Sequence, residues 1–311
     1  MNLTKKNLIY LMVALLMGSF LTLGINDLEQ SLQHYFFAQE LNSRTATAQL
    51  VTAKEKKEPI ERPDKFDVEL NANSAISVWT NLKDSKVLFE KKPKNSLPIA
   101  SLSKLMTNFV VMDLDETYSL NQPIVVTSKS VKQDGNFQLK PGEELTTKNL
   151  MAMSLISSSN DAAYALADYI GEKGFVGLMN YYAEKMNLDQ TKFYNPTGLK
   201  VEEEPENYSS VEDLVKLSKE ILRKHPLIFE LSSKESYKVR ELNGLVHHRI
   251  ENTNILLNDY PQIIGSKTGF TDNAKKCLLT VVKHDQGYVI NVLLGSNDRF
   301  GEMEKLINQV R

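Results

Sequence analysis

Apolar and polar residues follow two different periods along residues 75–310, and these periods predict the secondary structure of the chain. Alternation, or a short apolar run bounded by turn residues, indicates strands at 75–79, 86–90, 236–239, 277–282 and 288–294. Apolar residues three and four positions apart indicate helices at 102–115, 150–156, 161–169, 175–186 and 211–222, and a last helix ending near Val310. Because strands occupy both ends and helices the middle, we expect one sheet, completed from both ends, with an inserted helical subdomain.

A nearly unbroken apolar run of 18 residues at 8–25 stands apart from this pattern. As a helix it would be about 27 Å long, close to the roughly 30 Å thickness of a bilayer's hydrocarbon core. Lysines precede the run and carboxylates follow it, so we expect the amino terminus to stay in the cytoplasm. A cleaved secretory signal is the alternative, although the small-residue triplet at 46–48 lies well beyond the run. We expect a retained anchor at 1–25 and an exported remainder.

Residues 26–65 carry the features of a linker. An aromatic cluster at 35–37 could rest on the membrane surface, and the charged, proline-containing stretch at 54–65 has too few apolar residues to form a core. We therefore expect an extracytoplasmic linker at 26–65 and a folded domain at 66–311.

Composition narrows the functional classes. Of the 311 residues, 41% are hydrophobic and 24% are charged, which is ordinary for a globular protein, and the formal net charge of −2 gives no indication of nucleic-acid binding. The one cysteine, Cys277, cannot form an intrachain disulfide and reads as a small buried hydrophobe. The five histidines lack metal-ligand spacing, and His247 and His248 are predicted to form a solvated loop pair. No metal and no organic cofactor is expected.

The candidate chemistry starts at Ser101 and Lys104, which are three residues apart at the opening of a predicted helix and so share one face. A serine is a poor nucleophile until a base removes its proton, and an amine one turn away can be that base if it is uncharged. Alternatively, Ser101 is a helix N-cap and Lys104 a solvated surface lysine.

Two further motifs favour the catalytic interpretation. Ser158-Ser159-Asn160 lies between two apolar helical runs, and Lys267-Thr268-Gly269 precedes a predicted strand. A Ser-x-Asn sequence is a common accident, and 119–121 is a second copy, whereas Lys-Thr-Gly is rarer. It is not a phosphate-binding loop, because Ser266 replaces the required glycine. The order of the three motifs is that of penicillin-binding proteins and class A β-lactamases.

Longer stretches extend the match. The segments 193–199, 252–257 and 265–271 resemble the D-alanyl-D-alanine carboxypeptidases, the low-molecular-mass penicillin-binding proteins, and the resemblance covers the chain from about residue 66 to its end. The resemblance implies an α/β (α+β) fold of the β-lactamase/transpeptidase type. In that fold an antiparallel sheet is flanked by helices, with an inserted helical subdomain and the site in the crevice between the two.

The resemblance also implies roles for individual residues. Ser101 would attack the carbonyl of a terminal D-alanyl-D-alanine bond, Lys104 would act as general base, and Ser158 would pass the proton towards the leaving amine. Asn160 would hold the substrate amide and the Lys104 side chain. The base needs a lowered pKa, to which desolvation and Lys267 would contribute. A second cation about 4 Å away costs roughly 4 kcal/mol at an effective dielectric constant near 20.

Substrate binding would fall to the third motif. Lys267 and Thr268 suit a substrate carboxylate, and Gly269 leaves room for a peptide to pair with the strand edge. The backbone N–H groups of Ser101 and Phe270 would form the oxyanion hole. The implied partners are peptidoglycan pentapeptides, β-lactams and, through the amino-terminal segment, a membrane.

The chain departs from the family pattern in places. Phe270 stands where some carboxypeptidases have a polar residue, and Lys275 stands where a glycine usually follows Ala274. Many relatives continue into a β-rich second domain and a carboxy-terminal amphipathic anchor, whereas this sequence ends after the predicted closing helix. We therefore expect the amino-terminal segment to attach the protein to the cell membrane, with the catalytic domain outside. Secretion after signal cleavage is the alternative.

Three rival functions stay open. A class A-like β-lactamase would need a glutamate to activate the deacylating water, and Glu203 or Glu204 could supply it, although a solvated acidic loop is the simpler interpretation. A peptidoglycan DD-endopeptidase would use the same residues to cut crosslinks. A membrane-tethered scaffold would not catalyse at all.

Overall fold

The structure is a computed structural model that describes residues 64–132, 139–200 and 205–310. The expected membrane segment at 1–25, the linker as far as residue 63, and both Glu203 and Glu204 lie outside the described residues. Within the described ranges, no helix combines the length and the apolar character needed to cross a membrane.

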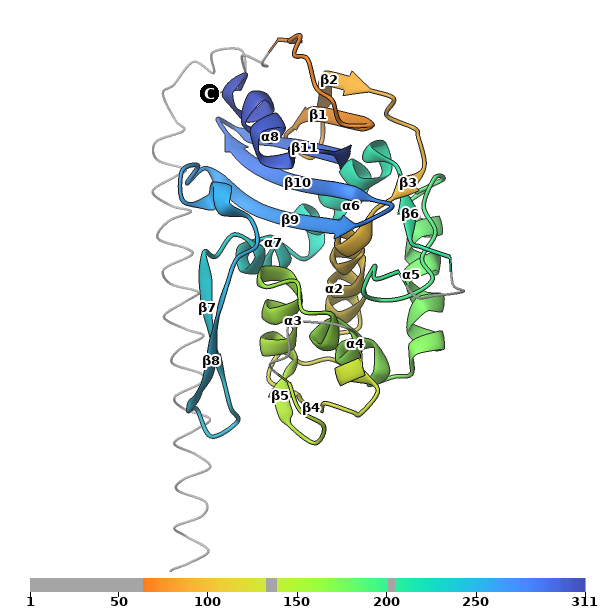
Figure 1. The fold of residues 1–311 in the computed structure, drawn as a ribbon, viewed down its shortest axis with the longest axis vertical. Helices are drawn as coiled ribbons and strands as arrows, with labels where there is room; N and C mark the ends of the chain where they lie inside the picture. Colours follow the sequence, from red (N-terminus) through yellow and green to blue (C-terminus); the bar gives the residue numbers. More distant parts are fainter. Residues whose placement is uncertain (1–63, 133–138, 201–204, 311) are drawn as a thin grey trace, which may run out of the picture. The chain divides into compact units, whose positions relative to one another are not determined.

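An antiparallel sheet of five strands organises the described part of the chain (Figure 1). Its order is β2-β1-β11-β10-β9, so the two strands from the start of the domain join the three from its end, and β9 forms one edge. This confirms the expected sheet, completed from both ends. The strands are β1 (Ser74–Thr80), β2 (Ser85–Lys91), β9 (Ile263–Thr271), β10 (Lys275–His284) and β11 (Gly287–Ser296).

The middle of the chain holds the five helices predicted there, within a few residues of their predicted bounds, together with a further short helix and short strands of which only the one at 236–240 was predicted. Polar side chains cap α3, α4, α6 and α8 by accepting a hydrogen bond from the first turn, which stabilises a helix start. The helices are α2 (Ser103–Asp113), α3 (Thr147–Ile156), α4 (Asn160–Asp168), α5 (Glu172–Lys185), α6 (Val211–Lys224), α7 (Leu227–Ser232) and α8 (Arg299–Asn308), with the 3-10 turns η1 (Ala100–Leu102), η2 (Ser130–Lys132) and η3 (Ile255–Leu257). The short strands are β3 (Leu97–Pro98), β4 (Pro123–Val125), β5 (Glu144–Thr146), β6 (Tyr208–Ser209), β7 (Ser236–Arg240) and β8 (Val246–Glu251).

The two faces of the sheet pack into two apolar clusters. Successive side chains of a strand point to opposite faces, so neighbours such as Leu278 and Leu279 of β10 fall into different clusters. Leu278 packs in the cluster that contains Met303 and Leu306 of α8, and Leu279 packs in the cluster that contains Phe109 of α2. Figure 1 shows α8 against the sheet and α2, α3 and α4 below its β9 edge. The sheet is thus buried between α8 and the helical part.

Helix α2 is buried around most of its circumference, including its polar side chains. Ser103, Thr107 and Asn108 are fully buried. The Ser103 hydroxyl donates to Ala100 O at 2.7 Å, and the Thr107 hydroxyl donates to Pro196 O at 2.6 Å. Because buried polar groups are costly without partners, these bonds fix both the helix and the loop beside it.

One prediction at this level is wrong. His247 and His248 do not lie in a solvated loop but on β8, where both side chains are partly buried. Val239 of β7 pairs with His248, and Tyr237 pairs with Ile250. The β8 segment carries little apolar alternation of its own, so only its pairing with β7 makes it a strand.

Candidate active site

The site begins at the turn before α2. Ser101 lies in η1, and the N-cap of α2 is Leu102, which makes no side-chain cap, so the interpretation of Ser101 as an N-cap is wrong. Ala100 adopts φ +47°, a left-handed conformation that is uncommon outside glycine and often found at functional sites. The strained turn places the Ser101 hydroxyl one turn before the Lys104 amine, with 2.9 Å between Oγ and Nζ.

Lys104 is not a solvated lysine, because its exposed fraction is 0%. Its Nζ donates to Asn160 Oδ1 and to Thr197 O, both at 2.7 Å. Burial, and next the charge of Lys267, hold the pKa of Lys104 well below its usual value. A neutral amine has two N–H groups and one lone pair. Asn160 Oδ1 and Thr197 O can only accept and so take the two N–H groups, which leaves the lone pair for the Ser101 hydroxyl.

The second lysine comes from the edge strand β9. Lys267 is only 1% exposed, and its Nζ donates to Ser158 Oγ at 2.9 Å and to Thr268 O at 3.0 Å. Burial, and next the charge of Arg299, lower the pKa of Lys267 to about 7. The Thr268 hydroxyl lies 2.6 Å from the hydroxyl of Thr253.

Two glycines allow the β9 strand and a neighbouring loop to approach the Ser101 turn. A Cβ at Gly269 would lie 2.9 Å from Ile99 O and 3.2 Å from Ser101 N, closer than side chains normally come. Gly198 has φ +75°, and a Cβ there would lie 1.9 Å from Ala100 O. Any side chain at either position would push the Ser101 turn out of place.

The second motif forms a sharp turn into α4. Ser158 has φ +61°, the Ser159 hydroxyl caps α4 by accepting from Ala162 N at 3.2 Å, and Asn160 is the first helical residue. This turn aims Asn160 at Lys104 and Ser158 at Lys267. The structure therefore brings Ser101, Lys104 and Asn160 into one hydrogen-bonded group and pairs Ser158 with Lys267.

Sequence reasoning missed two groups that complete this arrangement. The Thr197 carbonyl reaches Lys104 because Asn195 Oδ1 accepts from Thr197 N and Gly198 N at 3.1 and 2.7 Å, folding the loop into a tight turn. Arg299, the first residue of α8, donates from Nη1 to Gly269 O at 3.0 Å. The match at 193–199 marked the loop, but a backbone carbonyl leaves no signal in residue types. Arg299 lies outside the three motifs, so no motif spacing marked it.

The two residues that depart from the family pattern, Phe270 and Lys275, differ in their surroundings. Phe270 is 58% exposed beside the third motif. Lys275 has φ +55°, the left-handed region that glycine enters without steric cost, which explains why a glycine suits this position and gives the lysine a backbone cost.

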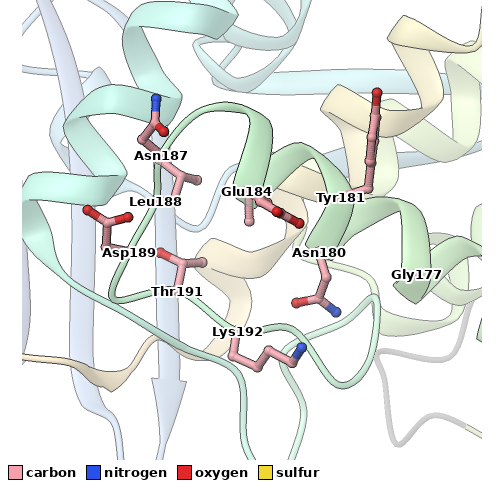
Figure 2. A pocket seen from close by; sticks show the side chains of 10 residues that line it. Gly177, Asn180, Tyr181, Glu184, Asn187, Leu188, Asp189, Thr191 and Lys192 are labelled. Atoms are coloured by element: carbon pink, nitrogen blue, oxygen red, sulfur yellow. The ribbon is translucent and has the colours of Figure 1, made fainter.

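A separate cavity of about 540 Å³ lies between α5 and the loop that follows it (Figure 2). Asn180, Tyr181, Glu184 and Lys192 are among its lining residues, and none of the motif residues is. Asn180 is already engaged, because its Nδ2 donates to Phe193 O at 2.8 Å. Across the described ranges, no three His, Cys, Asp or Glu side chains form a group that could hold a metal ion.

Comparisons with known proteins agree with this geometry. A protein-family model described as D-alanyl-D-alanine carboxypeptidase matches residues 56–298. The D-alanyl-D-alanine carboxypeptidase DacF of Bacillus subtilis is 34% identical over 248 residues, covering 77% of this chain and 62% of its own. The D-alanyl-D-alanine endopeptidase of Escherichia coli is 32% identical over 248 residues, covering 76% of each chain. This chain therefore spans about three-fifths of the length of the Bacillus relative.

Solved structures show the same fold. A penicillin-binding protein from Listeria monocytogenes, solved in its ampicillin-bound form, is 29% identical and superposes with a TM-score of 0.68, covering 79% of this chain and 99% of that one. The D-alanyl-D-alanine carboxypeptidase DacD from Francisella tularensis superposes with a TM-score of 0.70 at 24% identity, covering 82% and 73%. The expected sheet, flanking helices and inserted helical part are thus confirmed as a fold.

Proposed function

This chain belongs to the D-alanyl-D-alanine carboxypeptidase family, and on that premise we propose that it is a serine hydrolase that removes the terminal D-alanine from peptidoglycan stem peptides. The observation that carries the proposal is the Lys104 amine, which is fully buried, 2.9 Å from Ser101 Oγ and hydrogen-bonded to two oxygens that can only accept. An amine in that setting is a base, and the hydroxyl beside it is the nucleophile.

In the acylation step, the Ser101 proton passes to the lone pair of Lys104 Nζ as Oγ bonds to the carbonyl carbon. The carbon–nitrogen bond then breaks, and the proton held by Lys104 passes through the Ser158 hydroxyl to the leaving nitrogen, so that D-alanine departs and Lys104 is neutral again. Backbone N–H groups of Ser101 and Phe270 stabilise the oxyanion, and losing one such donor typically costs about a hundred- to a thousandfold in rate. In the second half, water attacks the ester carbon as Lys104 takes its proton, the bond from that carbon to Ser101 Oγ breaks, and the proton returns from Lys104 to Oγ.

Substrate recognition is assigned to β9. Lys267 and the Thr268 hydroxyl bind the carboxylate of the terminal residue, and a pKa of about 7 for Lys267 leaves it readily charged beside an anion. The missing side chain at Gly269 lets β9, and with it the carboxylate-binding groups, lie close to the Ser101 turn. A β-lactam acylates Ser101 by the same route, which the ampicillin-bound form of the Listeria relative supports.

One experiment tests the assignment. The full chain, solubilised in detergent, is incubated with a fluorescent penicillin and digested, and the modified peptide is mapped by mass spectrometry. The expected adduct lies on Ser101, and a pentapeptide-containing muropeptide loses one alanine. An adduct on another residue, or an intact pentapeptide after prolonged incubation, would contradict the proposal.

Endopeptidase activity is the second candidate, because a relative of that name is 32% identical over most of both chains. Crosslinked muropeptide dimers separate the two activities: an endopeptidase splits them, whereas a carboxypeptidase shortens only stems that end in two alanines. Rapid turnover of nitrocefin would instead indicate a β-lactamase.

The amino-terminal run at 8–25 supports a further proposal, that the protein is held in the cell membrane by a single span with the catalytic domain outside. Retention of the full-length chain in membranes after alkaline carbonate extraction, with protease access from the outer side, is the expected result. A shortened chain in the medium would favour secretion after signal cleavage.

A further inference from the structure

Two consecutive polar residues between the loop at 195–199 and β6 are buried. Glu206 is 6% exposed and Asn207 is 1% exposed. A carboxylate is seldom buried unless hydrogen bonds compensate for its lost hydration. Neither residue belongs to the three motifs. Their hydrogen-bond partners therefore indicate which parts of the site they hold in place.

Asn207 is bonded to the side of the site that carries Ser101. Its side-chain Nδ2 donates to Ser103 Oγ at 2.9 Å and to Asn195 O at 2.8 Å. Its backbone carbonyl oxygen accepts from Ile99 N at 3.1 Å. Ile99 and Ser103 flank the Ser101 turn, and Asn195 shapes the loop whose carbonyl reaches Lys104.

Glu206 is bonded to the opposite side, at the end of β9. Its Oε1 accepts from the Thr271 hydroxyl at 3.0 Å, and its Oε2 accepts from Asn273 Nδ2 at 2.8 Å. The Thr271 hydroxyl accepts in turn from Ala274 N at 3.0 Å. Both oxygens of one carboxylate thus fix the turn that follows the third motif.

We propose that Glu206 and Asn207 are positioning residues that tie the β9 end to the Ser101 turn and so set the spacing of the two backbone donors, on Ser101 and Phe270, that would stabilise the oxyanion. This rests on the proposed function. The spacing matters because β9 passes close to Ser101 N at Gly269, and Phe270 lies between that contact and Thr271. A displacement of about 1 Å can cost on the order of a hundredfold in rate.

The test uses the donor and acceptor pattern of the Glu206–Asn273 bond. Asn273→Asp sets two acceptors against each other and should break the tie. Adding Glu206→Gln supplies an amide donor towards Asp at 273 and restores the bond with its polarity reversed. The readout is the second-order rate constant for acylation of Ser101 in the full chain by a fluorescent penicillin, measured well below each variant's melting temperature.

We expect Asn273→Asp to slow acylation about tenfold to a hundredfold and the Glu206→Gln/Asn273→Asp pair to come within about threefold of the unsubstituted protein. The matched control is Asp272→Asn/Asn273→Asp, which has the same net charge as the rescued pair but no donor towards Glu206, so it should stay slow. Asp272 is exposed and adjacent to the turn position that is changed.

Equal rescue by the control would mean that only net charge matters, and an unchanged rate in Asn273→Asp would mean that the tie does not position the site; either result overturns the proposal. If Asn273→Asp does not fold, Thr271→Val removes the hydroxyl that donates to Glu206 and accepts from Ala274 N, and it should slow acylation several-fold. Failure of the unsubstituted chain to form an adduct on Ser101 would instead count against the proposed function, with the adduct on Ser101 as the distinguishing measurement.

Discussion

The two sides of the site each carry a buried lysine, but they hold it differently. On the α2 side, Lys104 Nζ contacts oxygens from three separate segments: Ser101, Asn160 and Thr197. On the β9 side, Lys267 Nζ bonds to Ser158 and to the carbonyl of its own neighbour. The pKa of Lys104 falls well below its usual value, whereas that of Lys267 falls to about 7. Under the proposed function, the same side chain would serve as a neutral base on one side and as a titratable cation on the other.

Both pKa values are lowered by burial first and by a neighbouring cation second. Arg299 lowers the pKa of Lys267, and Lys267 lowers that of Lys104. Each cation makes the next one easier to deprotonate, so both lysines hold their proton less readily than a solvated lysine.

The largest expected effect removes the nucleophile on the α2 side. Ser101→Ala should abolish the penicillin adduct and lower stem-peptide hydrolysis by about 10⁴-fold or more, because a base without a nucleophile has nothing to activate. Labelling with a fluorescent penicillin and mass spectrometry of muropeptides measure both. The control is Ser119→Ala, an exposed serine in the second Ser-x-Asn sequence, which should leave both unchanged. Persistent labelling of Ser101→Ala would identify a different nucleophile.

The same substitution on each side sharpens the comparison. Lys104→Arg should lower the acylation rate about 10²- to 10⁴-fold, because a guanidinium stays protonated and offers no lone pair. Lys267→Arg keeps the cation and should cost only about tenfold, mainly in KM. Acylation rates and steady-state KM values of the two variants, taken side by side, are the measurement. Similar losses in the rate constant for both would remove the proposed division between base and cation.

A methyl group between the two sides should have the next largest effect. Gly269→Ala places a Cβ 2.9 Å from Ile99 O, so β9 must move away from Ser101. We expect acylation to slow about tenfold to a hundredfold and the free energy of unfolding to fall by about 1–3 kcal/mol. Gly174→Ala on α5 is the control: its Cβ meets nothing within 4 Å, and the change should stabilise the helix by about 0.5–1 kcal/mol. Acylation kinetics and chemical denaturation measure the two effects in both variants. An unchanged acylation rate in Gly269→Ala would refute the close approach of β9 to the Ser101 turn.

The smallest expected effect lies in the pH dependence. Lys267, with a pKa of about 7, is a cation below that pH and neutral above it, so binding of a substrate carboxylate should weaken and KM rise as the pH increases through 7. Lys104 must be neutral, so kcat should fall on the acid side instead. Arg299→Met removes the neighbouring cation that, after burial, lowers the pKa of Lys267. The rise in KM should therefore move to higher pH in this variant. Profiles of kcat and KM against pH test this. If KM rises at the same pH in Arg299→Met as in the unsubstituted protein, Arg299 does not lower the pKa of Lys267.

Local periodicity predicted four of the five strands of the sheet, all but β9, and most helices. Residue types at motif spacing predicted which side chains the fold brings together. What escaped prediction depends on contacts between distant segments. β8 is a strand only because β7 pairs with it, and Glu206 can be buried because Thr271 and Asn273 donate hydrogen bonds to its carboxylate. The helix expected to open near Ser101 starts as a 3-10 turn, whose first residue, Ala100, is left-handed.

Cys277 is the partner of Gly269 across the β9–β10 pair, fully buried, and burial raises the pKa of its thiol to about 11. A thiol so shielded cannot meet a reagent until the strands around it separate. The rate at which a thiol-reactive dye consumes this single cysteine would therefore time the opening of the sheet edge, with and without a bound β-lactam. Any new cysteine placed on the surface could carry a fluorophore without first deleting the native one.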